Sequence, residues 1–295
     1  MRPGVGSDAN GGAFDPSIAG AGTDYSQQNA AQLSVADAVE NGTTTITSAT
    51  GGFSAAMIGN SLFDGTARFF ITAVASANSI TVDRATGTGS GLAVKVGGAL
   101  ATLDELYSAR GLVGSNVAYL QSSAALTIST GAYSPPSGAS DLGPTCLIGY
   151  HLARGDLDDS ADFLNHPQLL ANGSSVQLFS LATNYLHFRN LLLNASTGGP
   201  AALIAVNASS AGNYYFGNCR FTGAWTGRAV TMQGNFTLHR CLIDGCAGAA
   251  SLDVLSGTDN YCLSSASVGG TSPGATVNGS LYVSDSLIAG NSGAA

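Results

Sequence analysis

The stretch 238–245, Leu-His-Arg-Cys-Leu-Ile-Asp-Gly, decides the fold of this chain, because its pattern recurs from residue 188 onward. An apolar residue, a polar spacer and a small polar or basic residue precede a Cys or Leu, and a further apolar residue leads into a turn. The other copies lie at 188–194, 216–223, 260–263 and 283–290. Their central polar positions, 190, 218, 240, 260 and 285, give steps of 28, 22, 20 and 25 residues. A period in the twenties indicates a solenoid, whose units bury their apolar faces by stacking.

Each copy is predicted to be a strand, because its apolar and polar residues alternate with a period of two. A second set of alternating runs lies between the copies, at 202–206, 229–232, 251–255 and 275–278. Gly, Asn and Ser residues separate the two sets. Each period therefore holds at least two short strands, and the pattern predicts a parallel β-helix with coils about 4.8 Å apart.

The phase of the repeat predicts which side chains stack from one coil to the next. Cys219 and Cys241 occupy the same phase in successive coils, and small thiols of this kind are readily buried. We therefore expect both to face the interior. Asn190 and Asn218 share a corner phase, with Asn260 as a further candidate, and stacked amides at a corner can hydrogen-bond along the solenoid axis.

The composition sets limits on the class of protein. Of 295 residues, 44% are hydrophobic, enough for a substantial core in one or two domains, whereas only 9% are charged. The net charge is −8 and the only lysine is Lys95, so neither nucleic acid nor an anionic membrane is an expected partner. No apolar run reaches the ~18 residues of a membrane span, and the first residues lack the apolar region of a secretory signal.

The sequence predicts no metal or cofactor site. The five cysteines are odd in number and follow the strand phase, which favours reduced, mostly buried thiols; they are Cys146, Cys219, Cys241, Cys246 and Cys262. The four histidines lack metal-ligand spacing; they are His151, His166, His187 and His239. Phosphate-binding, nucleophile-elbow and zinc-protease motifs are likewise missing from the sequence.

The front of the chain has a different pattern. Longer alternating runs at 43–47, 67–74, 79–83 and 92–96 are separated by Gly, Asp and Asn, which predicts a small antiparallel sheet or barrel within residues 1–98. Residues 99–112 show helical spacing, and Thr102 and Glu105 form a capping-box pattern. We expect this helix to cap the first coil of a β-helix that occupies residues 113–295.

Several segments resemble a known family. The stretches 6–14, 22–28 and 147–156, together with the coils that follow, resemble the right-handed, pectate-lyase-like parallel β-helix proteins of tailed bacteriophages and their environmental relatives. The resemblance covers nearly the whole chain. It implies an all-β, right-handed parallel β-helix, assembly as a homotrimer, and a place on the virion after synthesis in the host cytoplasm. Both structural and glycan-cleaving proteins belong to this family, so the resemblance alone does not assign an activity.

Candidate catalytic carboxylates are few. A glycan-cleaving β-helix needs two carboxylates, or a calcium-bound lyase centre with an arginine or lysine base. Asp244 and Asp253 are either ordinary corner and surface residues without a basic partner, the preferred interpretation, or a pair across a groove. The acidic run Asp156, Asp158, Asp159 and Asp162 is either a solvated loop or a calcium site.

Two further motifs also have alternative interpretations. The tripeptide 154–156, Arg-Gly-Asp, matches an adhesion motif, although its arginine is better explained by a structural role. Tyr214, Tyr215 and Trp225 flank one coil. They either stack on a sugar ring or, as the preferred interpretation, fill the wall of the solenoid or contact a neighbouring subunit. We therefore assign no catalytic, cofactor-binding or metal-binding residue from the sequence.

These observations predict a non-enzymatic structural virion protein, either a head decoration (cement) protein or a short spike. Its expected partners are two further copies of itself, with the last coil at 281–289 covered by another chain, and other virion proteins such as the major capsid protein, to which the N-terminal region attaches. The alternatives are a tailspike-type depolymerase and a binder that recognises host surface polysaccharide without cleaving it.

Overall fold

The computed structural model shows an all-β protein with two compact units, Met1–Gly111 and Leu112–Ala295. The structure describes residues 1–107, 114–129, 132–158, 163–173, 176–182, 184–195, 204–223, 225, 229–246, 252–256, 260–263, 266–269, 275–277, 281–284 and 286–289. In this part of the chain, no helix has the length and apolarity needed to cross a membrane.

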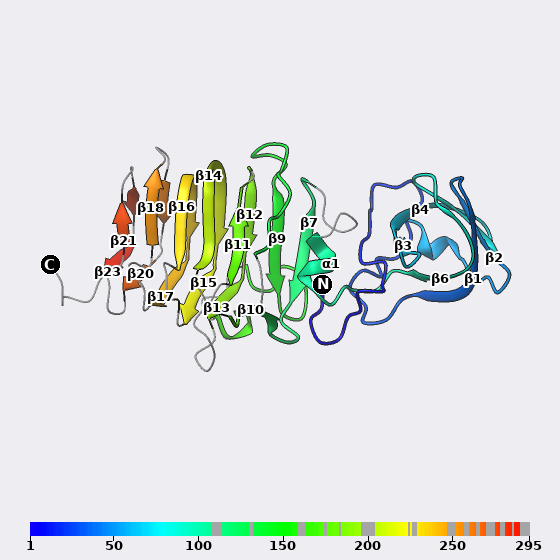
Figure 1. Ribbon diagram of the computed structural model, residues 1–295, viewed down its shortest axis with the longest axis horizontal. Helices are drawn as coiled ribbons and strands as arrows, with labels where there is room; N and C mark the ends of the chain where they lie inside the picture. Colours follow the sequence, from blue (N-terminus) through cyan, green and yellow to red (C-terminus); the bar gives the residue numbers. More distant parts are fainter. Residues whose placement is uncertain are drawn as a thin grey trace. The chain divides into compact units, whose positions relative to one another are not determined.

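The first unit contains a closed barrel, which confirms the predicted small antiparallel domain. Its strands follow the order β1-β2-β5-β4-β3-β6, and β6 pairs with β1 to close it (Figure 1). The elements are β1 (Leu33–Asn41), β2 (Thr45–Ser48), the 3-10 helix η1 (Ala55–Met57), β3 (Ser61–Phe63), β4 (Arg68–Ser76), β5 (Ser79–Val82) and β6 (Thr88–Val96). Inward apolar residues such as Ile46, Leu62 and Ile80 form its core.

Strand β1 did not stand out in the sequence because a bulge interrupts its alternation. The register with β6 shifts between Val35 and Ala38, and both of these residues are buried although they lie an odd number of positions apart. A bulge inserts an unpaired residue and so breaks the period of two. The barrel therefore gains a strand that the alternation pattern does not predict.

The helix begins later than predicted. Helix α1 spans Leu103–Tyr107, and residues 108–112 of the predicted helix lie outside the described residues. Residues 99–101 are not helical because they bond to the N-terminal segment: the Ala99 carbonyl accepts from Ser7 N at 2.9 Å. The expected cap is present, since Glu105 N donates to Thr102 Oγ1 at 3.4 Å. This helix belongs to the first unit, together with the barrel.

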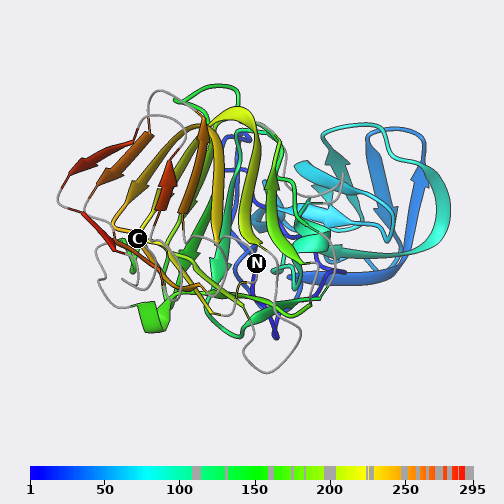
Figure 2. The ribbon, with the colours of Figure 1, turned by 60° about the vertical axis from the view of Figure 1, so that its left-hand side comes forward.

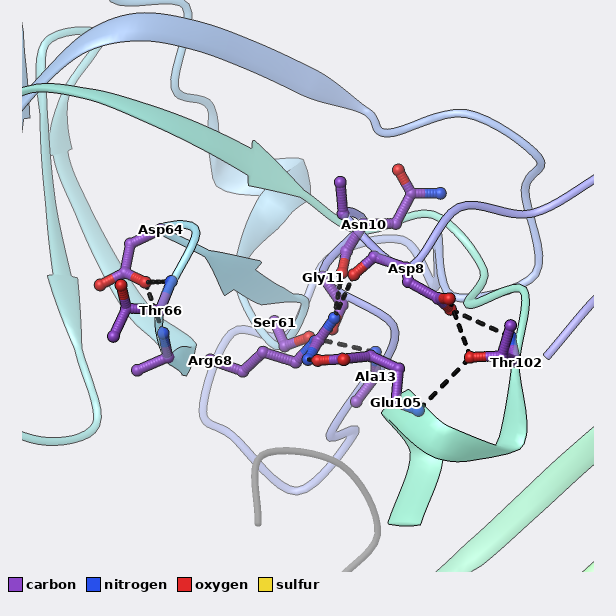
Figure 3. A network of polar contacts seen from close by, with 12 residues as sticks. Asp8, Asn10, Gly11, Ala13, Ser61, Asp64, Thr66, Arg68, Thr102 and Glu105 are labelled. Atoms are coloured by element: carbon purple, nitrogen blue, oxygen red, sulfur yellow. Dashed lines mark hydrogen bonds and ion pairs between the residues drawn. The ribbon is translucent and has the colours of Figure 1, made fainter. Parts of the chain in front are cut away.

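A buried arginine fixes the N-terminal segment to the barrel (Figure 3). Arg68 is 5% exposed, and it donates to the carbonyls of Gly11 at 2.8 Å, Asp8 at 2.7 Å and Asn10 at 3.0 Å. The same guanidinium forms an ion pair with Glu105 of α1. Three separate segments of the first unit therefore meet at one side chain.

The second unit consists of parallel strands in two curled sheets (Figures 1 and 2). One sheet has the order β23-β20-β17-β15-β13-β10-β8 and the other the order β21-β18-β16-β14-β12-β9-β7; β11 pairs with β14, and β19 pairs with β16 and β22. The elements are β7 (Val117–Gln121), β8 (Leu126–Ile128), β9 (Thr145–Tyr150), η2 (Phe163–Asn165), β10 (Gln168–Ala171), β11 (Gln177–Leu181), β12 (Leu186–Arg189), β13 (Leu192–Ala195), β14 (Ile204–Gly217), β15 (Arg220–Gly223), β16 (Val230–His239), β17 (Leu242–Cys246), β18 (Leu252–Ser256), β19 (Asn260–Leu263), β20 (Ala266–Gly269), β21 (Ala275–Val277), β22 (Tyr282–Ser284) and β23 (Leu287–Ala289).

The strand register corrects one of the repeat positions. Leu186 pairs with Tyr214, Tyr214 with Phe236, and Phe236 with Asn260, so successive coils are 28, 22 and 24 residues long. Asn260 therefore begins a strand and does not share the corner of Asn190. The corner that follows His239 corresponds to the one that follows Leu263, because these two residues are paired.

Coil length varies, but one part of each coil has a constant length. Leu186 is the first residue of β12, and Tyr214 in β14 and Phe236 in β16 hold the paired positions of the next two coils. From each of these three positions to the start of the next strand in the seven-stranded sheet, the chain advances six residues. These segments run from Leu186 to Leu192, from Tyr214 to Arg220 and from Phe236 to Leu242. The extra residues of the longer coil lie elsewhere, including the irregularity between Ala208 and Gly212.

The interior contains the ladders that the repeat phase predicts. The rings of Phe188 and Phe216 stack with centroids 5.0 Å apart. Cys219 and Cys241 are both buried, with exposed fractions of 0% and 3%, which confirms their predicted orientation. At the corner, Asn218 Nδ2 donates to Asn190 Oδ1 at 3.1 Å, so this pair of stacked amides is also confirmed.

Candidate functional site

A polar groove opens on the outer side of β12, β14 and β16, where these strands turn into the seven-stranded sheet. Its volume is about 300 Å³. It is lined by Asp158, Arg189, Asn190, Tyr215, Gly217, Asn218, His239 and Arg240. We call it the corner groove.

Strand pairing brings together residues that are far apart in the sequence. Arg189, Gly217 and His239 are direct neighbours in the register of β12, β14 and β16. Residues of these strands alternate between inside and outside, so Arg189 and His239 point away from the buried Phe188 and Leu238. Three successive coils thus each contribute one residue, Arg189, Gly217 or His239, to a single row in the groove.

Gly217 allows the neighbouring tyrosine to lie across the row. A Cβ atom at this position would come within 2.7 Å of Tyr215 Cε1 and 2.9 Å of its phenol oxygen. Any larger residue would therefore push the Tyr215 ring outward. With glycine, the ring lies over the strand between the arginine on one side and the histidine on the other.

Three side chains hold the Tyr215 ring. Its phenol oxygen is hydrogen-bonded to His239 Nδ1 at 3.1 Å, and the guanidinium carbon of Arg189 lies 5.4 Å from its ring centroid. The His187 ring packs against it with centroids 5.1 Å apart. Burial, together with the nearby Arg189, lowers the pKa of His187, which favours a neutral imidazole at this contact.

The corner beside the row has an unusual backbone. Asn190, Asn218 and Arg240 all have left-handed conformations, with φ values of 57°, 52° and 54°. Asparagine tolerates this region better than most residues, whereas an arginine there is uncommon. The repeated conformation turns each strand toward the seven-stranded sheet at the same place, which brings Arg240 into the groove lining.

Asp158, the last residue of the loop 151–158, lines the corner groove, and the loop is anchored to the neighbouring coils. Asn190 Nδ2 donates to Asp158 Oδ1 at 2.8 Å, and Asn218 Nδ2 donates to the Leu157 carbonyl at 2.8 Å. Both asparagines are buried. The predicted amide pair therefore joins two coils and also anchors the loop.

Asp156 stabilises the same loop from within. Its carboxylate accepts from the backbone N–H groups of His151 at 2.9 Å, Leu152 at 2.6 Å and Ala153 at 2.9 Å. Burial alone would raise the pKa of Asp156, but these hydrogen bonds outweigh it and lower the pKa. Both carboxylate oxygens are therefore engaged by the protein's own backbone.

The segments considered as an alternative calcium site and as an adhesion motif have structural roles where the structure describes them. The Arg154 guanidinium lies over the Tyr119 ring, 4.2 Å from its centroid, as its structural interpretation predicts. Asp159 and Asp162 lie outside the described residues. Among the residues that are described, no group of three or more His, Cys, Asp or Glu side chains is placed to hold a metal ion.

The alternative interpretation of Asp244 and Asp253 as a carboxylate pair is not supported. Asp244 on β17 pairs with Arg220 on β15, with Nη2 2.8 Å from Oδ2 and Nε 3.2 Å from Oδ1. The expectation that this acid lacks a basic partner was therefore wrong. Asp253 belongs to β18 of the ten-stranded sheet, whereas Asp244 belongs to the seven-stranded sheet.

The three aromatic candidates separate into two groups. Tyr214 and Trp225 are buried wall residues, and the Tyr214 hydroxyl donates to the Leu181 carbonyl at 3.2 Å. Tyr215 alone contributes to the corner groove. The sequence pattern did not identify Arg189, His239 and Arg240 as one site. Aligning the repeat copies by strand register would have placed Arg189 beside Gly217 and His239.

Comparisons with known proteins give no relative: no protein-family model, curated protein or solved structure matches this chain.

Proposed function

We propose that this chain is a non-enzymatic structural component of a tailed-phage particle. The observation that carries the non-enzymatic part is the corner groove, where Asp158 is the only carboxylate in the described lining. Glycosidases of the usual kind need two carboxylates about 5 to 9.5 Å apart. Asp158 is already hydrogen-bonded to Asn190, Asp156 accepts backbone hydrogen bonds from its own loop, and Asp244 is paired with Arg220.

We further propose that the second unit is a right-handed parallel β-helix. Its strands are parallel and recur in the same order from coil to coil, which supports a helical path. Crossovers between parallel strands of one sheet are right-handed in about 98% of cases. The same chirality argument applies to each coil here.

The particle role rests on the resemblance of segments 6–14, 22–28 and 147–156 to phage β-helix proteins.

A homotrimer is further supported by the last strands. Val283 pairs with Cys262, and Cys262 with Leu238, so Val283 holds the same register position as the buried Leu238, yet its own side chain is 49% exposed. Tyr282 beside it is 55% exposed. A neighbouring copy would cover this apolar surface, while the barrel unit would attach to other virion proteins such as the major capsid protein.

Light scattering coupled to size-exclusion chromatography tests the assembly. We expect the isolated protein to elute as a trimer, and a monomer that keeps its β-sheet circular dichroism at micromolar concentration would overturn the proposal. The number of copies per particle would then separate a head decoration, with hundreds of copies, from a short spike with only a few.

A second candidate is a binder of host surface polysaccharide that does not cleave it. The corner groove favours this candidate, because an aromatic ring flanked by guanidinium groups suits a sugar. Incubation with the host polysaccharide discriminates the functions. Saturable binding without new reducing ends would support the binder, whereas release of reducing ends would support a tailspike-type depolymerase.

A further inference from the structure

The positive charges of the second unit are unevenly distributed. The protein has a net charge of −8, and residues 112–295 contain five basic residues, Arg154, Arg189, Arg220, Arg228 and Arg240. Arg220 is paired with Asp244, and Arg154 packs on Tyr119. Arg189 and Arg240 line the corner groove. Guanidinium groups are therefore concentrated at one small site on an acidic protein.

Arg189 has hydrogen-bonding capacity to spare. In the described part of the chain it forms no ion pair, its side chain is exposed, and its contact is with the face of the Tyr215 ring. A guanidinium has five N–H donors in a planar fork that matches the oxygens of a carboxylate or phosphate. Stacking on the ring leaves the edge of that fork available to a ligand.

The groove holds these groups in fixed positions. Gly217 allows the Tyr215 ring to form the floor, and the bond to His239 Nδ1 and the contact with His187 fix the ring. Arg189 and His239 stand on strands on either side of β14, so they flank this floor. A site whose parts are held before a ligand arrives loses less entropy on binding.

At this corner, Arg240 replaces the asparagine that the two preceding coils carry. The two preceding coils place an asparagine at the same left-handed corner, and asparagine suits that backbone better. Residues in sparsely populated backbone conformations cluster at functional sites. The arginine at this corner adds a second guanidinium to the groove, which Asp158 also lines.

We infer that the corner groove binds a small oxyanion, a carboxylate or phosphate group on a hydroxylated ligand. Arg189 and Arg240 bind the anionic group, and Asp158 accepts a hydrogen bond from a hydroxyl of the same ligand. The volume of about 300 Å³ is close to the smallest ligand pockets and fits one monosaccharide. The ligand is either an acidic sugar or a free phosphate compound. The inference adds a ligand class to the polysaccharide-binding candidate, but it rests on the groove and not on any role in a particle.

Isothermal titration calorimetry with the full chain tests the inference, using glucuronate, glucose and inorganic phosphate as probes. We expect one saturable site per chain for glucuronate and no binding of glucose, because glucose lacks the carboxylate. Phosphate binding without glucuronate binding would also support the site and would identify free phosphate as the source. Absence of binding for both anions would overturn the inference. Light scattering tests the trimer separately. A failure of anion binding therefore leaves the proposed assembly testable, and a failure of the assembly leaves anion binding testable.

Matched variants locate the site. Arg189→Gln and Arg240→Asn, which keeps a residue suited to the left-handed backbone, should each weaken anion binding at least tenfold. Arg154→Gln removes the same charge from the same unit outside the groove and should leave the affinity within twofold of the parent. An equal loss in Arg154→Gln would show a general effect of net charge and would overturn the site. Unchanged circular dichroism in all three variants confirms that they are folded.

Discussion

Tyr215 on β14 and His239 on β16 are joined side chain to side chain across adjacent coils, with the phenol oxygen 3.1 Å from Nδ1. These residues are 24 positions apart in the chain, and strand pairing alone brings them together. The bond sets the position of the aromatic floor of the corner groove. It also occupies one imidazole nitrogen, so the other nitrogen is the one available to a ligand.

Tyr215→Phe should lower the free energy of unfolding by about 1 kcal/mol, the usual net value of one hydrogen bond. The ring contacts with His187 and Arg189 are kept in this variant. Urea unfolding followed by circular dichroism measures the change. A loss beyond about 3 kcal/mol would mean that the ring, and not the bond, is disturbed.

Gly217→Ala should displace the Tyr215 ring while leaving the coils intact. The added Cβ would lie 2.7 Å from Cε1, but the clash is with the outer part of a side chain that can rotate away. We expect a stability change below about 1 kcal/mol, within the common range for single substitutions. The His239 side-chain resonances should shift in NMR spectra as the bond to Tyr215 is lost. Unchanged resonances would contradict the described position of the ring.

Cys219 and Cys241 should resist alkylation in the native protein. Both are buried, and burial followed by the neighbouring Cys241 thiol raises the pKa of Cys219, so little reactive thiolate forms there. Mass spectrometry of maleimide-treated protein should find both residues unlabelled before denaturation and labelled after it. Rapid native labelling of either thiol would show that the coil register is wrong.

Glu40→Gln should stabilise the barrel unit at neutral pH. Glu40 is 4% exposed, its Oε1 has no hydrogen-bond partner, and burial, followed by repulsion from Asp64, raises its pKa. An acid whose folded pKa is raised binds its proton more tightly in the folded state, so stability falls as the pH rises through that range. The melting temperature of the variant should exceed that of the parent at pH 7. The difference should vanish below the pKa of the unfolded chain, about 4.3 for a glutamate.

Arg68→Met should destabilise the barrel unit by about 3 kcal/mol or more, because it leaves the Glu105 carboxylate and the carbonyls that Arg68 binds without their donor. Arg84→Met is the matched control. Its arginine is 53% exposed and pairs with Asp83, so its loss should cost less than about 1 kcal/mol. Guanidinium unfolding of both variants gives the comparison, and equal losses would refute a special role for Arg68.

The alternation of apolar residues predicted much of the strand structure, because a strand with one buried face needs an apolar residue at every second position. Cys219 and Cys241 were placed correctly for this reason. Asn260 was placed wrongly because coil length varies, and counting along the sequence cannot locate the extra residues. The corner groove was not predicted, since its Arg189 and His239 become neighbours only through the strand register.

The loop residue of the groove was even less accessible to sequence reasoning. Asp158 belongs to a segment without any repeat, and its contact with Asn190 spans 32 residues. Helix α1 began later than expected because hydrogen bonds to the N-terminal segment hold Ala99 in a non-helical conformation. Both cases depend on tertiary contacts, which override local preference.

The constant six-residue advance from Leu186 to Leu192, and again from Tyr214 to Arg220 and from Phe236 to Leu242, makes this edge of the molecule modular. Insertions elsewhere in a coil leave the spacing of side chains along the edge unchanged. Outward residues such as Arg189 and His239 can then be replaced one at a time while the strand register and the buried residues stay the same. Evolution or a protein engineer can thus alter what this edge recognises without redesigning the core beneath it.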